Sequence, residues 1–161
     1  MDGDGAIIVG DYRYLLWRTW DMTHPRLLWI LLNPSHADGK NDDQTLRRCR
    51  RFTQQRNCGG LEIVNLFAYR ASDPESLLHT CNPVGDENDD HVKEAIERAT
   101  DIVVAWGAWG AKDMYRQRAK AVRGLLSQYP EKQLLCLGKT LEGCPRHPCR
   151  MATDTPWQTF P

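Results

Sequence analysis

Residues 26–35 decide the fold, and they read Arg26-Leu27-Leu28-Trp29-Ile30-Leu31-Leu32-Asn33-Pro34-Ser35. The apolar run has the length of a strand and no polar alternation, which is typical of a strand buried on both faces of a parallel sheet. The run stops abruptly at Asn33-Pro34-Ser35, where an amide, a proline and a hydroxyl predict a turn. We therefore expect a central strand that ends in polar residues.

Outward from this strand, similar runs alternate with helical patterns. Further strands are predicted at residues 61–67, 101–106 and 133–137, and helices at residues 44–56, 87–99 and 112–128. This alternation predicts an α/β fold with three layers, in which helices cover both faces of a mainly parallel sheet of about four strands. Residues 6–9 and 12–17, around Gly10-Asp11, predict an N-terminal β-hairpin at a sheet edge. The tail from Gly138 carries several prolines and reads mostly as loop.

Length and composition limit the class of protein. With 161 residues, 41% of them hydrophobic, the chain is expected to fold as one domain over residues 1–161. Its 21 basic and 21 acidic residues cancel, which excludes a generally basic nucleic-acid coat but not a local basic face. The chain has no apolar run of membrane-spanning length and no secretion signal at its start, so we expect a cytoplasmic protein with reduced cysteines.

Polar residues follow each predicted strand. Asn33-Pro34-Ser35 follow the first, Asn65 the second, Trp106-Gly107 the third, and Lys139 and Arg146-His147 the last. Ligands of open α/β sheets bind at the carboxyl ends of the strands, so these side chains are predicted to share one rim. Taken singly, each has an ordinary structural explanation, as a turn residue, a core tryptophan or a surface histidine.

Other signals of chemistry are weak. Neither 107–110 nor 138–140 has the spacing of a phosphate-binding loop, and the Cys144–Cys149 segment lacks the Cys-x2-Cys pairs of a zinc site, so no metal and no organic cofactor is predicted. Arg48 and Arg51 on the predicted helix 44–56 are candidate phosphate contacts. A solvated helix face explains them equally well.

Five motifs together resemble an uncharacterised family of bacteria and phages, the domain of unknown function 1643. The motifs are Leu32-Asn33-Pro34-Ser35, residues 64–74 from Val64 to Pro74, Pro83-Val84-Gly85 with Asn88, Ala105-Trp106-Gly107, and Pro145-Arg146-His147-Pro148. The resemblance covers almost the whole chain from residue 26 onward. The family name implies no activity.

The order of the strand-end signals is also similar, more distantly, to that of the uracil-DNA glycosylase superfamily. That resemblance implies a glycosylase-like fold in which Asn33 positions a water, Asn65 recognises a base and His147 stabilises the departing base. Asp38 is a nearby carboxylate that could assist the water, and Phe67 could stack on the base. The remaining candidates for the substrate pocket are Pro34, Ser35, Arg70, Trp106, Gly107 and Arg146, and Lys139 is a further candidate for contacting nucleic acid.

Three hypotheses follow. The first is a protein that binds a nucleobase and hydrolyses its N-glycosidic bond in DNA, a reaction that needs oriented donors for the leaving base more than a strong nucleophile. The second is a non-catalytic nucleotide or nucleic-acid binding module, for example in phage–host conflict. The third is an enzyme acting on a small free nucleotide. The expected partner is DNA or a nucleotide, with no membrane and no stable protein partner indicated.

Overall fold

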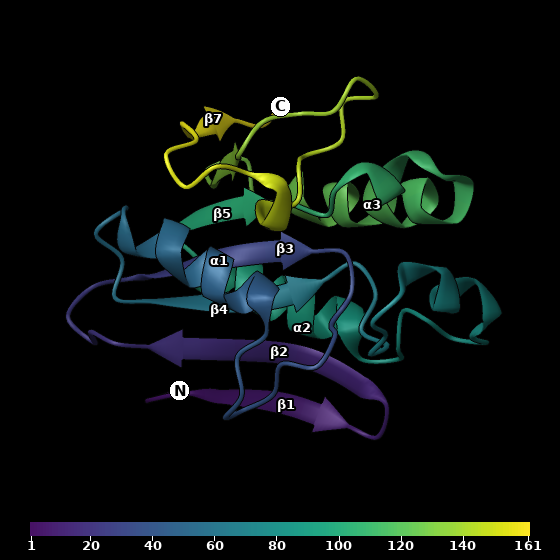
Figure 1. The fold of residues 1–161 in the computed structure, drawn as a ribbon, viewed down its shortest axis with the longest axis horizontal. Helices are drawn as coiled ribbons and strands as arrows, with labels where there is room; N and C mark the ends of the chain where they lie inside the picture. Colours follow the sequence, from purple (N-terminus) through teal and green to yellow (C-terminus); the bar gives the residue numbers. More distant parts are fainter.

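A computed structural model describes residues 1–161, apart from the side chains of residues 110 and 111. One seven-stranded sheet, in the order β1-β2-β4-β3-β5-β6-β7, forms its centre (Figure 1). The strands are β1 (Gly5–Val9), β2 (Tyr12–Thr19), β3 (Arg26–Leu31), β4 (Gly60–Asn65), β5 (Asp101–Val104), β6 (Gln133–Cys136) and β7 (Gln158–Thr159). The helices are α1 (Gln44–Gln54), α2 (Asn88–Arg98) and α3 (Asp113–Leu126), with short 3-10 helices η1 (Pro74–His79), η2 (Ala108–Ala111) and η3 (Pro148–Arg150).

The four predicted core strands form the parallel centre of the sheet. β3 lies between β4 and β5 and pairs in parallel with both, and β5 pairs in parallel with β6. Residues 27–31 of β3 and all of β4 are buried, as continuous apolar runs predict for strands that are covered on both faces. The α/β class is therefore confirmed.

The sheet is larger than predicted, with seven strands instead of about four, and it is mixed. The predicted N-terminal hairpin is present at the edge of the sheet, and because its strand β2 pairs antiparallel with β4, both hairpin strands add to the sheet. β7 lies in the tail that was predicted as loop and pairs antiparallel with β6 through two residue pairs. Both additions depend on pairing between distant segments, which the local pattern of the sequence does not encode.

Helices cover both faces, as predicted. α1 lies in front of the sheet in Figure 1 and buries Leu46, Cys49 and Phe52 in the same core cluster as Trp29 and Leu31. α2 and α3 cover the other face, where their apolar residues pack with those of β3, β4 and β5 that point that way. Each helix follows its predicted range to within three residues.

A β-bulge interrupts the pairing of β1 with β2. Ile7 pairs with Leu15 whereas the next residue, Ile8, pairs with Arg13, so Tyr14 is an extra residue in β2. Tyr14 stacks on His91 of α2, with ring centroids 5.0 Å apart. A bulge changes the face to which the preceding side chain points. Arg13 is thereby placed on the α1 side of the sheet.

All six cysteines are free thiols. No helix in the described part of the chain combines the length and apolar character that crossing a bilayer would need.

Candidate functional site

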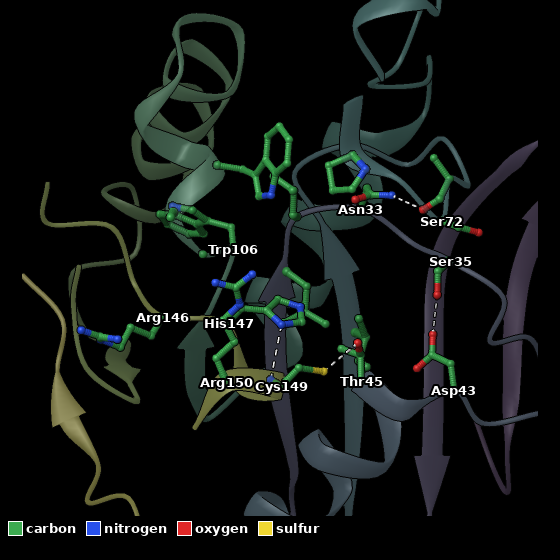
Figure 2. Close-up of a pocket in the computed structure, with 18 of the residues that line it drawn as sticks. Asn33, Ser35, Asp43, Thr45, Ser72, Trp106, Arg146, His147, Cys149 and Arg150 are labelled. Atoms are coloured by element: carbon green, nitrogen blue, oxygen red, sulfur yellow. Dashed lines mark hydrogen bonds between the residues drawn. The ribbon is translucent and has the colours of Figure 1, made fainter. Parts of the chain in front are cut away.

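A cavity of about 680 Å³ opens at the carboxyl ends of β3 and β5 (Figure 2). Its size is typical of a pocket for a small organic ligand. Segments that lie far apart in the sequence line it together. Six of the predicted site residues are among its lining residues: Asn33, Ser35, Trp106, Gly107, Arg146 and His147.

His147 reaches into the cavity as a neutral ring with a defined tautomer. Burial lowers the pKa of His147 to about 4, so the imidazole is uncharged at neutral pH. Its Nδ1 accepts a hydrogen bond from the backbone N–H of Cys149 at 3.4 Å, which leaves the proton of the neutral ring on Nε2. The side chain therefore offers a hydrogen-bond donor rather than a base.

Gly107 permits this placement of His147. The backbone of Gly107 has φ +80°, and a Cβ atom there would lie 3.2 Å from the Cβ of His147. The N–H of Gly107 also donates to the carbonyl of Pro145 at 2.8 Å, which fixes the 145–147 segment beside the end of β5. The backbone conformation at position 107 and the close approach of His147 thus both require the glycine that follows Trp106.

Asn33 and Ser35 occupy the opposite wall in Figure 2. The Asn33 Nδ2 donates to the carbonyls of Pro34 and Ala71 at 3.0 and 2.8 Å, so Oδ1 is the amide atom left to accept from a ligand or water. The Ser35 hydroxyl donates to Asp43 at 2.7 Å. The other oxygen of Asp43 accepts from the N–H of Leu46 at 2.8 Å and caps α1.

The rim combines aromatic rings with positive charge. Trp106 is buried, and partly buried Trp109 lies beside it on the cavity wall. The ammonium of Lys112 stands 4.1 Å from the centre of the Trp109 ring. Arg146 and Arg150 are exposed cations that also line the opening, and they outnumber the one exposed carboxylate among the described lining residues, that of Glu142. Such a rim suits an anionic group joined to a flat ring.

Arg13 is a lining residue that the sequence analysis did not identify. It is 4% exposed, and its Nη1 donates to the carbonyl of Ala37 at 2.8 Å. Burial lowers the pKa of the guanidinium to about 10, which keeps it charged at neutral pH. An arginine in a strand reads as solvent-facing, and only the combination of the bulge with the 33–43 loop explains its burial. No local signal of the sequence reveals it.

Asn65 and Phe67 are not cavity-lining residues. Asn65, at the end of β4, is 1% exposed and accepts a hydrogen bond from the Nη2 of Arg13 at 3.5 Å. Its Nδ2 has no partner among the described residues. Phe67 is equally buried and packs edge-on against Tyr115 in the core. The structure thus places Asn65 behind the cavity, next to Arg13, and Phe67 in the core, so the prediction that they bind the base from the rim is wrong.

The remaining candidates also lie outside the lining. Pro34 and Arg70 hold the loop that borders the cavity: the Pro34 carbonyl accepts from the N–H of Ala71, and Arg70 donates to the carbonyl of Ser35 at 3.5 Å. Asp38 accepts from the N–H groups of Lys40 and Asn41, and these bonds lower its pKa to about 2.

The three predicted nucleic-acid contacts do not line the cavity either. Arg48 is bound to the tail through the carbonyl of Met151 and the hydroxyl of Thr153. Arg51 is exposed in the last turn of α1, and Lys139 is exposed after β6. These three residues therefore do not belong to the group that the fold brings together.

Two further lining residues are in contact, because the hydroxyl of Thr45 lies 3.2 Å from the thiol of Cys149. No group of three or more histidine, cysteine, aspartate or glutamate side chains is close enough to hold a metal ion among the described residues.

The fold and the cavity define a three-layer α/β protein with a mixed sheet and a polar pocket at the carboxyl ends of its parallel strands. The chain belongs to the DUF1643 family, whose model, described as a protein of unknown function, matches residues 13–149. The matched region begins at Arg13 and ends at Cys149, and so contains both walls of the cavity. No curated protein and no solved structure matched the chain, and the likeness to uracil-DNA glycosylases gains no support from these comparisons.

Proposed function

We propose that the cavity binds a nucleobase, with the rest of the nucleotide at the cationic rim, and that the protein hydrolyses the N-glycosidic bond of that nucleotide in DNA. The observation that carries the proposal is the neutral His147, whose Nε2–H is offered inside a cavity that also contains indole rings. A flat base is bound by stacking and by hydrogen bonds to its edge.

The chemistry of the reaction fits these groups. Breaking an N-glycosidic bond places negative charge on the departing base, and a fixed neutral donor stabilises that charge without being deprotonated itself. The sugar becomes an oxocarbenium-like cation, which a weakly activated water can attack. The Oδ1 of Asn33 is available to orient such a water. The electron pair of the broken bond leaves with the base, the water oxygen bonds to the sugar carbon, and the proton that the water loses passes to the departing base or to bulk solvent.

The test is base release from oligonucleotides that carry uracil, hypoxanthine or other altered bases, detected as strand cleavage after alkali. The wild-type protein is expected to produce abasic sites with at least one of these bases. Because the donor acts mainly in the transition state, His147→Gln is expected to lower the rate about 100-fold. His79→Gln changes an exposed histidine outside the cavity and is expected to retain the wild-type rate. Absence of abasic sites across the panel with excess protein would contradict excision.

One observation favours a second candidate, a binding module without catalysis. Both oxygens of Asp43 are engaged, one by Ser35 and one by the N–H of Leu46, so this carboxylate is not poised to activate water. Such a module would bind nucleotides or DNA and leave them intact. Equilibrium binding measured against salt concentration separates a DNA reader, which loses affinity steeply, from a binder of free nucleotides, which loses little.

A further inference from the structure

The guanidinium of Arg13 is a buried charge with spare hydrogen-bonding capacity. Among the described residues it forms no ion pair within 4.0 Å, and its Nε has no partner although the atom is buried. Only a carbonyl at 2.8 Å and the Asn65 amide oxygen at 3.5 Å accept from it. A buried donor without an acceptor costs about 1–3 kcal/mol, so this arrangement is unfavourable unless a ligand completes it.

The surroundings of Arg13 indicate what kind of group completes it. The cavity residues on this side of the sheet include the apolar side chains of Leu16, Leu31 and Ile63. The carboxylate of Asp43 also lines the cavity and acts electrostatically on Arg13. An apolar pocket with a nearby negative charge disfavours a hydrated phosphate. Such a pocket suits a flat, uncharged ring whose hydrogen-bond acceptors face the guanidinium.

We infer that Arg13 selects the base, and that the cavity prefers bases with two adjacent acceptors on one edge. A guanidinium fork donates two parallel hydrogen bonds, and the O6 and N7 atoms of guanine are its commonest partner among bases. Hypoxanthine presents the same O6/N7 pair, and cytosine presents O2/N3. Adenine and uracil place a donor beside each acceptor of their pairing edges and cannot receive both bonds. This inference rests on the proposed binding of a nucleobase and adds the class of base.

The test compares matched pairs of 5′-monophosphates by calorimetric titration. IMP and AMP differ in the group at position 6, an acceptor in the first and a donor in the second. CMP and UMP differ in the same way at position 3. All four carry the same phosphate for the rim, so a difference within a pair reports the base edge. If the base that the cavity recognises is a 6-oxopurine, we expect IMP to bind at least about tenfold more tightly than AMP. If that base is cytosine, we expect CMP to bind at least about tenfold more tightly than UMP.

Variants test whether Arg13 is responsible. Arg13→Lys keeps the charge but loses the planar fork, and Arg13→Met removes both, so each is expected to reduce the preference within the pair to less than about threefold. Arg98→Met, on the opposite face of the sheet, is the matched control and is expected to keep it. Circular dichroism verifies that each variant is folded, and the comparison of ligands on the wild-type protein stands without any variant.

The outcomes separate the two proposals. Equal binding within both pairs would overturn the role of Arg13 and leave nucleobase binding intact. A preference that survives in both Arg13 variants would also overturn it. Failure of all four nucleotides and of DNA to bind would instead contradict the proposed function itself.

Discussion

Strand β2 carries a buried arginine near each end, and their surroundings differ. Arg18 is 2% exposed, and both its Nε and Nη2 donate to Asp42, at 2.9 and 2.7 Å. Its Nη1 donates to the carbonyl of Trp17, and its Nη2 donates also to the carbonyl of Asp38. Arg13 is 4% exposed, has no carboxylate partner among the described residues, and keeps an unpaired Nε beside the cavity.

The difference separates two uses of a buried charge. Arg18 is satisfied within the protein and fastens the 38–42 loop to the sheet, so its role is structural. Arg13 is incompletely satisfied within the protein, which is the state expected of a residue that binds a ligand. Burial alone therefore does not distinguish the two, and the inventory of hydrogen-bond partners does.

The largest effect is expected from Arg18→Met. Removing the buried member of this partly buried ion pair leaves the carboxylate of Asp42 and the carbonyls of Trp17 and Asp38 without their donors, and we expect the free energy of unfolding to fall by about 3 kcal/mol. Urea denaturation at pH 7 measures this change. A loss below about 1 kcal/mol would mean that the pair contributes no more than an exposed ion pair, and the contrast with Arg13 would then fail.

An effect of intermediate size is expected from acid, through His147. Its pKa in the folded protein, about 4, lies below the ordinary value of about 6.5, so the unfolded chain binds a proton more readily. The stabilisation is complete above pH 6.5 and is lost as the pH falls toward 4. Between pH 7 and pH 4.5 we expect wild type to lose about 2 kcal/mol more stability than His147→Gln, measured by urea denaturation. Equal losses would show that His147 is solvated in the folded protein.

The smallest effect on stability is expected from Arg13→Met. Replacing an incompletely paired buried charge by an apolar side chain of similar length removes a desolvation cost, while it leaves two acceptors, the carbonyl of Ala37 and the weakly bound amide oxygen of Asn65, without a donor. These changes oppose each other, so we expect the free energy of unfolding to change by less than about 1 kcal/mol. Urea denaturation alongside Arg18→Met makes the comparison direct. A loss as large as that of Arg18→Met would assign both arginines the same structural role.

The parallel centre of the fold could be predicted because its signal is local. β3 and β4 are apolar along their length, and α1 carries its buried residues at helical spacing. The size of the sheet could not be predicted in this way. β7 has only two residues and exists because β6 offers a free edge, and β2 joins the sheet through a partner more than 40 positions along the chain.

The residues of the candidate site likewise fall into those that the sequence could reveal and those that it could not. Asn33, Trp106 and His147 could be found because strand ends of a parallel sheet converge on one edge. The rule does not say which way a strand-end side chain points, and so it included Asn65, which is buried behind the cavity. Arg13 enters the cavity from an antiparallel strand, to which the rule does not apply.

Tyr14, the extra residue in β2, determines on which face of the sheet the guanidinium of Arg13 lies. With one residue more in β1 opposite Tyr14, the ladder would be regular, the ring of Tyr14 would face the pocket, and the guanidinium of Arg13 would point to the α2 layer. A single insertion in β1 opposite the bulge can thus replace the charge in the cavity by an aromatic ring without altering the order of the strands. The ligand preference inferred for this cavity therefore depends on where the hairpin bulges as well as on the presence of the arginine.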